Sequence, residues 1–392
     1  MIKVKIPLAE NTISKKEIYL LAAWIKKNEK LTKGKLTVRF ENLFSKWLKR
    51  KYSIFVNSGS SANLLIAQSL LEGDYLKNKT IIVPAVSWIT TVTPFLQLGY
   101  NVKLCDCDKN NLGLNIKHFE YLCKKYKPSC VILVHVLGHP NNMQRIKSIS
   151  KKYNIKIIED ACEAIGSSIK NKKLGTFGLA TSFSFFYGHH LSTIEGGMVS
   201  TDDKVLYNIM LSVRSHGWAR DLGGKERKNL EKKYNIDEIR SLYSFYYSGF
   251  NLRSTDLNAF IGLQQIKKLN KIIKIRESNY KLYLKELSNF WCQKSSASVI
   301  SNFGFATLVK NRLEVFKFLK KKGIETRPLI CGNIGSQPLW LKKFKKQKLP
   351  NAEIVHNFGI YLPNNSSISK KKIKFICENF KKIAVKKDFN NL

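Results

Sequence analysis

The chain has 392 residues, of which 44% are hydrophobic and 11% aromatic, as expected for a globular protein with a sizeable core. Its 68 Lys and Arg residues against 28 Asp and Glu residues give a formal net charge of +40. The lysines are spread along the chain instead of forming a basic tail or an aromatic-rich basic patch, so we expect a solvated surface and no nucleic-acid partner. No apolar run is long enough to span a bilayer, and the N-terminus lacks a signal-peptide core, which predicts a cytoplasmic protein without a membrane segment.

The hydrophobic pattern predicts two amphipathic helices, over 13–30 and 37–50, followed by alternating strands and helices. The expected strands are SIFVNS, TIIVPA, NVKLCD, CVILVHV and IKIIED, and the helices after the first four lie near 60–71, 88–98, 115–126 and 141–153. Two short strands, TSFSFF and GGMVST, come next. This order is typical of an α/β fold whose mostly parallel sheet is covered on both faces. A long Lys-rich helix starting near 262 marks the change from a large domain over 1–261 to a smaller α+β domain over 262–392.

Residues suited to ligand binding follow several of these strands, and in such sheets ligands gather at the carboxyl ends of the strands. Gly59 and Ser60 stand between a strand and a helix, where free N–H groups can bind a phosphate, although Ser58 or Ser60 could simply cap the helix. Asp160 ends the strand IKIIED and could cap a following helix or pair with a protonated ring nitrogen. Trp88 could belong to the core or stack on a flat ligand.

Several sequence blocks, in chain order over nearly the full length, resemble the DegT/DnrJ/EryC1/StrS sugar aminotransferase family. They include LTKGKLTVRFENLF, VNSGSSANLL, VPAVSWITTVTPFLQLG, VHVLGHPNNM, IIEDACEAIGS and GFNLRSTDLNAFIGLQQI. Members of the family use pyridoxal 5′-phosphate (PLP), so the resemblance implies a fold-type I PLP-dependent transferase. It also implies a homodimer, because Asn251 in GFNLR would reach the cofactor phosphate of the other subunit.

The resemblance further implies a role for each residue of a PLP site. The phosphate would be held by Gly59, Ser60 and Ser184. Trp88 would stack on the ring, and Glu163 would lie near it. Asp160 would pair with the protonated ring nitrogen, which lets the ring act as an electron sink.

One residue departs from the pattern of the aminotransferases. They place the lysine that binds PLP covalently a few residues after the SFSF strand, and His189 stands at that position. An imidazole cannot form this bond, but it is a competent general base near neutral pH. The replacement resembles the nucleotide-sugar 3-dehydratase branch of the family, and the segments RPLICGNIGSQPLW and VHNFGIYLPNN also look like that branch.

This second resemblance implies a reaction. The amine form of the cofactor, pyridoxamine 5′-phosphate (PMP), would react with the C4 ketone of a 4-keto-6-deoxy nucleotide sugar, in particular GDP-4-keto-6-deoxymannose. His189 would move a proton at the cofactor, the C3 hydroxyl would leave, and L-glutamate would restore PMP. Such a product belongs to 3,6-dideoxyhexose and lipopolysaccharide O-antigen biosynthesis. The alternatives are an aminotransferase-like enzyme acting on another 4-keto sugar and a catalytically silent sugar-nucleotide-binding protein.

The other histidines and the cysteines refine these expectations. His190 is expected to orient its turn, whereas His216 corresponds to a second active-site histidine of the branch and would either act on the leaving hydroxyl or make a structural hydrogen bond. The CDP-sugar members of the branch carry an iron–sulfur cluster on cysteines after the catalytic strand. This chain has no cysteine between Cys162 and Cys292, so we expect neither that cluster nor another metal site.

Overall fold

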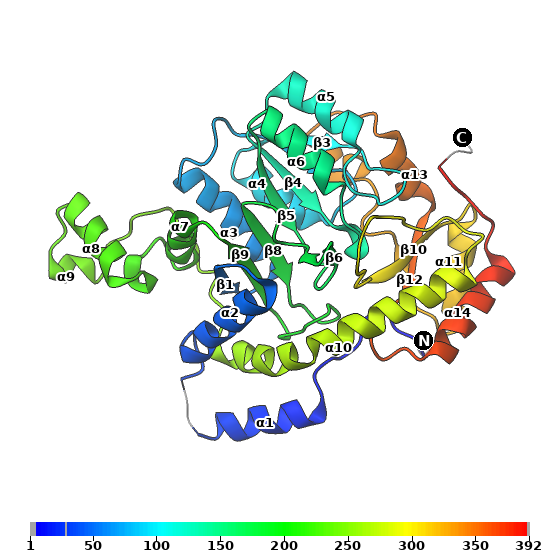
Figure 1. Ribbon diagram of the computed structural model, residues 1–392, viewed down its shortest axis with the longest axis horizontal. Helices are drawn as coiled ribbons and strands as arrows, with labels where there is room; N and C mark the ends of the chain where they lie inside the picture. Colours follow the sequence, from blue (N-terminus) through cyan, green and yellow to red (C-terminus); the bar gives the residue numbers. More distant parts are fainter. Residues whose placement is uncertain (1–4, 28–29, 390–392) are drawn as a thin grey trace.

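The computed structural model describes residues 5–27 and 30–389 (Figure 1). Within this part of the chain, the largest sheet has seven strands in the order β1-β9-β8-β5-β4-β2-β3. The strands are β1 (Tyr52–Val56), β2 (Thr80–Pro84), β3 (Asn101–Cys105), β4 (Cys130–Val134), β5 (Lys156–Asp160), β8 (Ala180–Ser184) and β9 (Gly197–Thr201). Strand β9 pairs antiparallel with β1 and β8, and the other pairs are parallel. The expected mostly parallel α/β sheet is therefore confirmed.

Helices cover both faces of this sheet because its strands are apolar on both sides. In β1, Ile54 packs in the cluster that includes α3 and α7, whereas its neighbour Phe55 packs in the cluster of α2 and α10. The alternation follows from the two-residue period of a strand. The helices on the two faces are α2 (Lys35–Leu48), α3 (Gly59–Glu72), α5 (Ile116–Tyr126), α6 (Met143–Lys152), α7 (Lys204–Arg214) and α10 (Asp256–Glu286).

A second, antiparallel sheet in the order β10-β12-β11 lies at the other end of α10 (Figure 1). Its strands are β10 (Gly304–Leu308), β11 (Arg327–Pro328) and β12 (Gly359–Pro363), and nearby helices are α11 (Arg312–Lys321), α12 (Pro338–Leu341), α13 (Pro350–Phe358) and α14 (Lys370–Ile383). Helix α10 is one continuous element of 31 residues that packs on α2 at one end and on α14 at the other. The domain boundary expected at 261/262 therefore falls inside a helix shared by both parts.

Several helices differ from the sequence prediction. The helix expected over 13–30 is α1 (Lys15–Ile25), and residues 28–29 lie outside those described. The helix expected over 88–98 is divided into a 3₁₀ turn, η1 (Ile89–Thr91), and a short α4 (Thr93–Gln97). Pro94 lies in the first turn of α4 and donates no backbone hydrogen bond, which favours a new start over a continuous helix.

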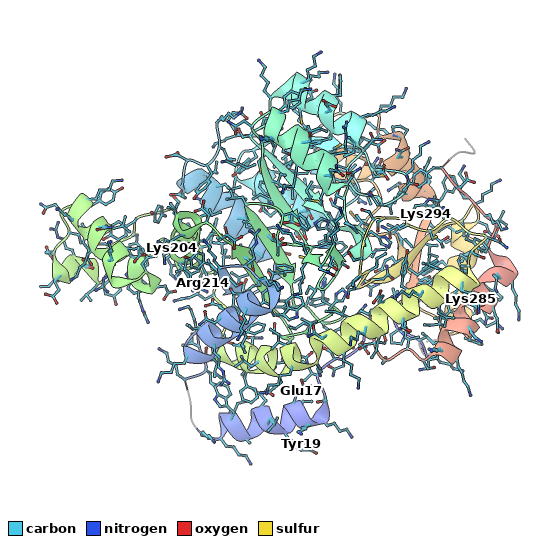
Figure 2. The ribbon with its side chains drawn as sticks, viewed as in Figure 1. Glu17, Tyr19, Lys204, Arg214, Lys285 and Lys294 are labelled. Carbon is cyan, nitrogen blue, oxygen red and sulfur yellow. The ribbon has the colours of Figure 1, made fainter. Side chains whose placement is uncertain are left out.

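Side-chain contacts hold α1 against α10 (Figure 2). Glu17 accepts a hydrogen bond from Lys268 Nζ at 2.7 Å, and Tyr19 on the same helix is 74% exposed.

Two helices that the sequence analysis did not anticipate, α8 (Gly224–Lys233) and α9 (Glu238–Ser241), stand away from the rest of the molecule at the left of Figure 1. Within the described residues, no helix combines the length and apolar character that crossing a bilayer requires.

Candidate active site

The start of α3 forms a cradle at the carboxyl end of β1. Ser58 caps the helix, because its Oγ accepts a hydrogen bond from the amide of Ser61 at 3.0 Å. The amides of Gly59 and Ser60 come before the first full turn and have no intrahelical acceptor, and the side chain of Ser60 is exposed. A Cβ at position 59 would lie 2.6 Å from the Cβ of Ser184, so the close approach of α3 to the end of β8 requires glycine. These free amides provide donors for an anion.

The other expected strand-end residues lie at the same edge of the sheet. Strands β2, β4, β5 and β8 all run in the same direction, because each neighbouring pair among them is parallel. Strand β1 shares this direction, because β9 is antiparallel to both β1 and β8. Trp88 follows β2, Asp160 ends β5 and Ser184 ends β8. Trp88 is 57% exposed, so the alternative that it belongs to the core is wrong.

Asp160 is buried and held by hydrogen bonds to both of its carboxylate oxygens. Oδ2 accepts from Asn63 Nδ2 at 3.0 Å and from Thr91 Oγ1 at 2.9 Å, and Oδ1 accepts from the amide of Cys162 at 3.2 Å. The segment after β5 is a turn, so the prediction that Asp160 could cap a following helix is wrong. The carboxylate is therefore fixed at the sheet edge by α3, by η1 and by its own turn.

The adjacent acid, Glu159, has a different environment because successive strand residues face opposite sides of the sheet. Its two carboxylate oxygens accept hydrogen bonds from the amides of Gly175, Phe177 and Gly178, at 2.9, 2.7 and 2.7 Å. His135 Nε2 lies 3.0 Å from Glu159 Oε2. Glu159 thus stabilises the 175–178 turn inside the protein.

His189 lies in the turn between β8 and β9. Its Nδ1 atom is 2.9 Å from the carbonyl oxygen of Cys162. A carbonyl only accepts, so Nδ1 must carry a proton, and Nε2 of the neutral ring is left as the acceptor. Burial lowers the pKa of His189 to about 4, so the ring is neutral at physiological pH. This turn also requires glycine before the histidine, because Gly188 has a φ of +96° and a Cβ there would lie 2.6 Å from the Cβ of Ala9.

The neighbouring His190 is completely buried. Its Nε2 atom lies 2.8 Å from the carbonyl oxygen of Ser301, so Nε2 carries the proton and ties the turn to the segment before β10. Burial lowers the pKa of His190 well below its ordinary value. These contacts support the expectation that His190 orients the turn.

Glu163 follows Asp160 by three residues and is half-buried. Its Oε2 atom accepts a hydrogen bond from the amide of Leu137 at 2.9 Å. Burial, and to a smaller extent the negative charge of Asp160, raise the pKa of Glu163 to about 7. A carboxyl group with this pKa can donate or accept a proton near neutral pH.

His216 and Asn251 form a separate group on the segment that follows α7. A bridge pairs Ser215 with Asn251, and both predicted site residues are exposed. Arg253 joins them: its Nε donates to Asn251 Oδ1 at 3.0 Å, and its Nη2 lies 3.4 Å from His216 Nε2. Arg253 also bridges to Val56 at the end of β1. Among the described residues, no hydrogen bond links this group to Asp160 or His189.

The two closely spaced cysteines, Cys105 and Cys107, are buried in the core clusters. Burial raises the pKa of both thiols well above the ordinary value. Over residues 5–27 and 30–389, no three His, Cys, Asp or Glu side chains are placed together as a metal would require.

The sequence model of the DegT/DnrJ/EryC1/StrS aminotransferase family matches residues 12–381. The chain belongs to this family. One member, the GDP-4-keto-6-deoxy-D-mannose 3-dehydratase of Yersinia pseudotuberculosis, is 33% identical over 394 residues, which cover 97% of this chain and 99% of the relative. A GDP-perosamine synthase of Escherichia coli O157:H7 is 30% identical over 355 residues, which cover 89% of this chain and 90% of the relative.

A solved member of the family confirms the fold-type I architecture. The crystal structure of a GDP-4-keto-6-deoxymannose 3-dehydratase with a trapped PLP–glutamate geminal diamine has a TM-score of 0.87 and 31% identity, covering 96% of this chain and 100% of that one. The resemblance to the DegT/DnrJ/EryC1/StrS family is thus confirmed along nearly the whole chain.

Sequence reasoning missed several residues that build the site. Asn63 and Thr91 hold Asp160, and the backbone of Cys162 contacts both Asp160 and His189. Phe303 packs on His189 with the ring centroids 5.0 Å apart. Asn63 lies one helical turn after Gly59 and could have been identified from this spacing. The contact with Phe303 joins residues more than one hundred positions apart and has no local signal.

Proposed function

We propose that this protein is a PLP- and PMP-dependent nucleotide-sugar 3-dehydratase that removes the C3 hydroxyl of GDP-4-keto-6-deoxymannose. The observation that carries the proposal is a neutral histidine, His189, at the position where family aminotransferases have their PLP-binding lysine. The two curated relatives named as GDP-4-keto-6-deoxy-D-mannose 3-dehydratases, each 33% identical to this chain, support the same substrate. The product would enter 3,6-dideoxyhexose and lipopolysaccharide O-antigen biosynthesis.

The residues of the site fit the cofactor. Gly59 and Ser60 offer free amides and a hydroxyl to a phosphate, and only glycine at 59 lets this cradle approach Ser184. Trp88 offers an exposed aromatic face to the ring, and the fixed carboxylate of Asp160 suits a protonated ring nitrogen. When bound, the cofactor supplies an electron sink and, in its amine form, the amine that reacts with the C4 ketone of the sugar.

The protein's own side chains would then perform the proton transfers. His189 would move a proton through Nε2 at the C4′ atom of the cofactor, because Nδ1 already donates to Cys162. Asp160 would keep the ring nitrogen protonated, and Glu163, with its pKa near 7, would lie beside the ring. His216 would protonate the departing C3 hydroxyl or bind the sugar.

The proposal includes a homodimer in the cytoplasm, with Asn251 completing the phosphate site of the other subunit. The dimer is supported by the projecting region of α8, α9 and the residues directly after α9, where three large apolar side chains face solvent. Ile239 is 81%, Tyr243 74% and Leu242 62% exposed, and neighbouring exposed apolar side chains mark protein–protein contacts. A second copy of the chain would cover these residues. Light scattering of the purified protein tests the dimer, and a monomeric mass at micromolar concentration would contradict it.

A substrate panel tests the activity. Protein, PLP and L-glutamate are incubated with GDP-4-keto-6-deoxymannose, and mass spectrometry follows the sugar while a coupled assay follows ammonia. Loss of the C3 oxygen together with ammonia release is the expected result. CDP-, UDP- and dTDP-linked 4-keto sugars serve as comparisons for the nucleotide. An amino sugar as the product would instead indicate an aminotransferase, and an unchanged sugar across the whole panel would indicate a binding protein.

A further inference from the structure

The ring of Phe303 lies against the catalytic turn from the side of the smaller sheet. Its centroid is 5.0 Å from that of His189, with the two planes inclined by 41°, and 6.0 Å from that of His190. Phe303 precedes β10, and its amide donates to the carbonyl oxygen of Leu137 at 3.1 Å. The backbone of Phe303 is thus attached to the large sheet's loops while its side chain contacts both histidines.

Arg276 holds Phe303 from the other direction. This residue of α10 is completely buried, and its guanidinium lies 5.8 Å from the centroid of the Phe303 ring. Its Nη1 donates to the backbone carbonyl of Phe303 at 3.2 Å and also to that of Asn364. Within the described residues, Nε and Nη2 of Arg276 make no hydrogen bond. A buried guanidinium with two unpaired nitrogens is costly for stability, and the hydrogen bonds that it does make go to the carbonyls of Asn302, Phe303 and Asn364.

The imidazole of His189 is therefore restrained by two contacts. The carbonyl of Cys162 fixes Nδ1, and the ring of Phe303 covers part of the imidazole. A rotation of the imidazole would break the hydrogen bond, and a shift towards the smaller sheet would meet the aromatic ring. Nε2 of His189 has no hydrogen-bond partner among the described residues and stays available for proton transfer.

We propose that Phe303, held in place by Arg276, is the positioning residue that keeps the His189 imidazole in its reactive orientation. This inference deepens the proposed function and rests on it. The charged groups that act on His189 are Arg276 and Asp160, and His189 in turn acts on the neighbouring His190. Burial is the main cause of the lowered pKa of His189, the positive charge of Arg276 adds to the lowering, and Asp160 opposes it. Phe303 supports the neutral state by excluding water from one side of the ring.

The test replaces Phe303 with a smaller side chain and measures the pKa of His189 directly. In cofactor-free Phe303→Leu protein, NMR titration of the imidazole signals reports the pKa of His189, which a His189→Asn spectrum identifies among the 7 histidines. We expect this pKa to rise from about 4 towards its ordinary value, because water gains access to the ring. In the loaded enzyme we expect kcat for dehydration to fall by about 10- to 100-fold with KM little changed.

Phe305→Leu is the matched control, because Phe305 is buried in β10 and packs on Tyr283 instead of either histidine. This variant loses the same volume nearby, so it measures the effect of destabilisation alone. Phe303→Tyr keeps the ring and should retain the pKa and kcat of the unaltered protein. If Phe303→Leu matches Phe305→Leu in both measurements, the positioning role is wrong. The NMR titration needs no substrate, so a shifted pKa in a protein without dehydratase activity would overturn the proposed function and leave the restraint on His189 standing.

Discussion

The side-chain amide of Asn63 donates to Oδ2 of Asp160 at 3.0 Å and thereby joins α3 to β5. Asn63 lies one turn after Gly59, so the helix that offers its amides to a phosphate also holds the carboxylate proposed to meet the cofactor ring. This hydrogen bond links the phosphate cradle directly to Asp160, in addition to the contacts that Asp160 makes with Thr91 and Cys162. In this arrangement the start of α3 can bind the phosphate of a flat ligand while Asp160 binds its ring.

Replacement of Asn63 should weaken cofactor binding. In Asn63→Ala the buried carboxylate of Asp160 loses one of its three hydrogen bonds, and a hydrogen bond to a charged group contributes about 1.5–3 kcal/mol. We expect PLP affinity, measured by fluorescence quenching, to fall roughly tenfold if most of this cost appears in binding. Gln68→Ala, on the same helix but hydrogen-bonded to Glu72, is the control and should bind PLP normally.

The close approach of Gly59 to Ser184 leads to a prediction about the stability of the protein. A methyl group there would lie 2.6 Å from the Cβ of Ser184, so Gly59→Ala should destabilise the protein by about 1–3 kcal/mol, as overpacking usually does. Chemical denaturation measures this loss. The double variant Gly59→Ala with Ser184→Gly removes the opposing Cβ and should recover part of the stability. Equal stabilities for the single and double variants would show that the two residues do not meet.

Two substitutions of His189 should test separately whether the residue at this position binds PLP covalently and whether it transfers a proton. In His189→Lys the ε-amine can bind PLP covalently, so borohydride reduction should leave a PLP-sized mass increment on the peptide that contains position 189, while dehydration falls sharply. In His189→Ala, dehydration should fall by about 100-fold or more, the usual contribution of a general base. Undiminished dehydration by His189→Ala would refute the assignment of His189 as the base.

Glu163 should make stability depend on pH. Its pKa is raised to about 7 in the folded protein, above the ordinary value of 4.5, so between these values the folded state binds more protons than the unfolded state. Stability must then fall as pH rises through this window. We expect the Tm to fall less between pH 5.5 and 7.5 in Glu163→Gln than in the unaltered protein. Parallel Tm curves for the two proteins would contradict the raised pKa.

The fold could be predicted from the sequence where the signals were local. Short apolar strands between amphipathic helices predicted the parallel sheet, and the glycine and serine after β1 predicted the cradle. The start of α10 was misplaced, because the prediction followed the Lys-rich pattern from 262 and overlooked Thr255, whose hydroxyl caps the helix at 3.2 Å from the amide of Asn258. The exposed helices α8 and α9 have too little buried apolar surface to leave a strong pattern.

The candidate site was predictable to a similar degree. Asp160 was proposed from its place at the end of a strand, where ligands gather in such sheets, whereas Ser184 came from the family resemblance. The surroundings of His189 were not found, since the carbonyl of Cys162 and the ring of Phe303 reach it through tertiary packing. Backbone carbonyls have no sequence signature, and a lone aromatic residue before a strand is ordinary in any core.

The pairing of the N-terminal segment with the smaller sheet has a consequence for how the protein is made. Ile6 bridges to Ile324, and the carbonyl of Pro7 accepts from Asn365 Nδ2 at 3.0 Å. The segment around Ile6 and Pro7 therefore has no docking place until Asn365, 358 positions after Pro7, has been synthesised. The stretch that ends at Ala9 lies against Gly188, the glycine before His189, so the surroundings of the His189 turn are completed only after the segment that holds this stretch has been made.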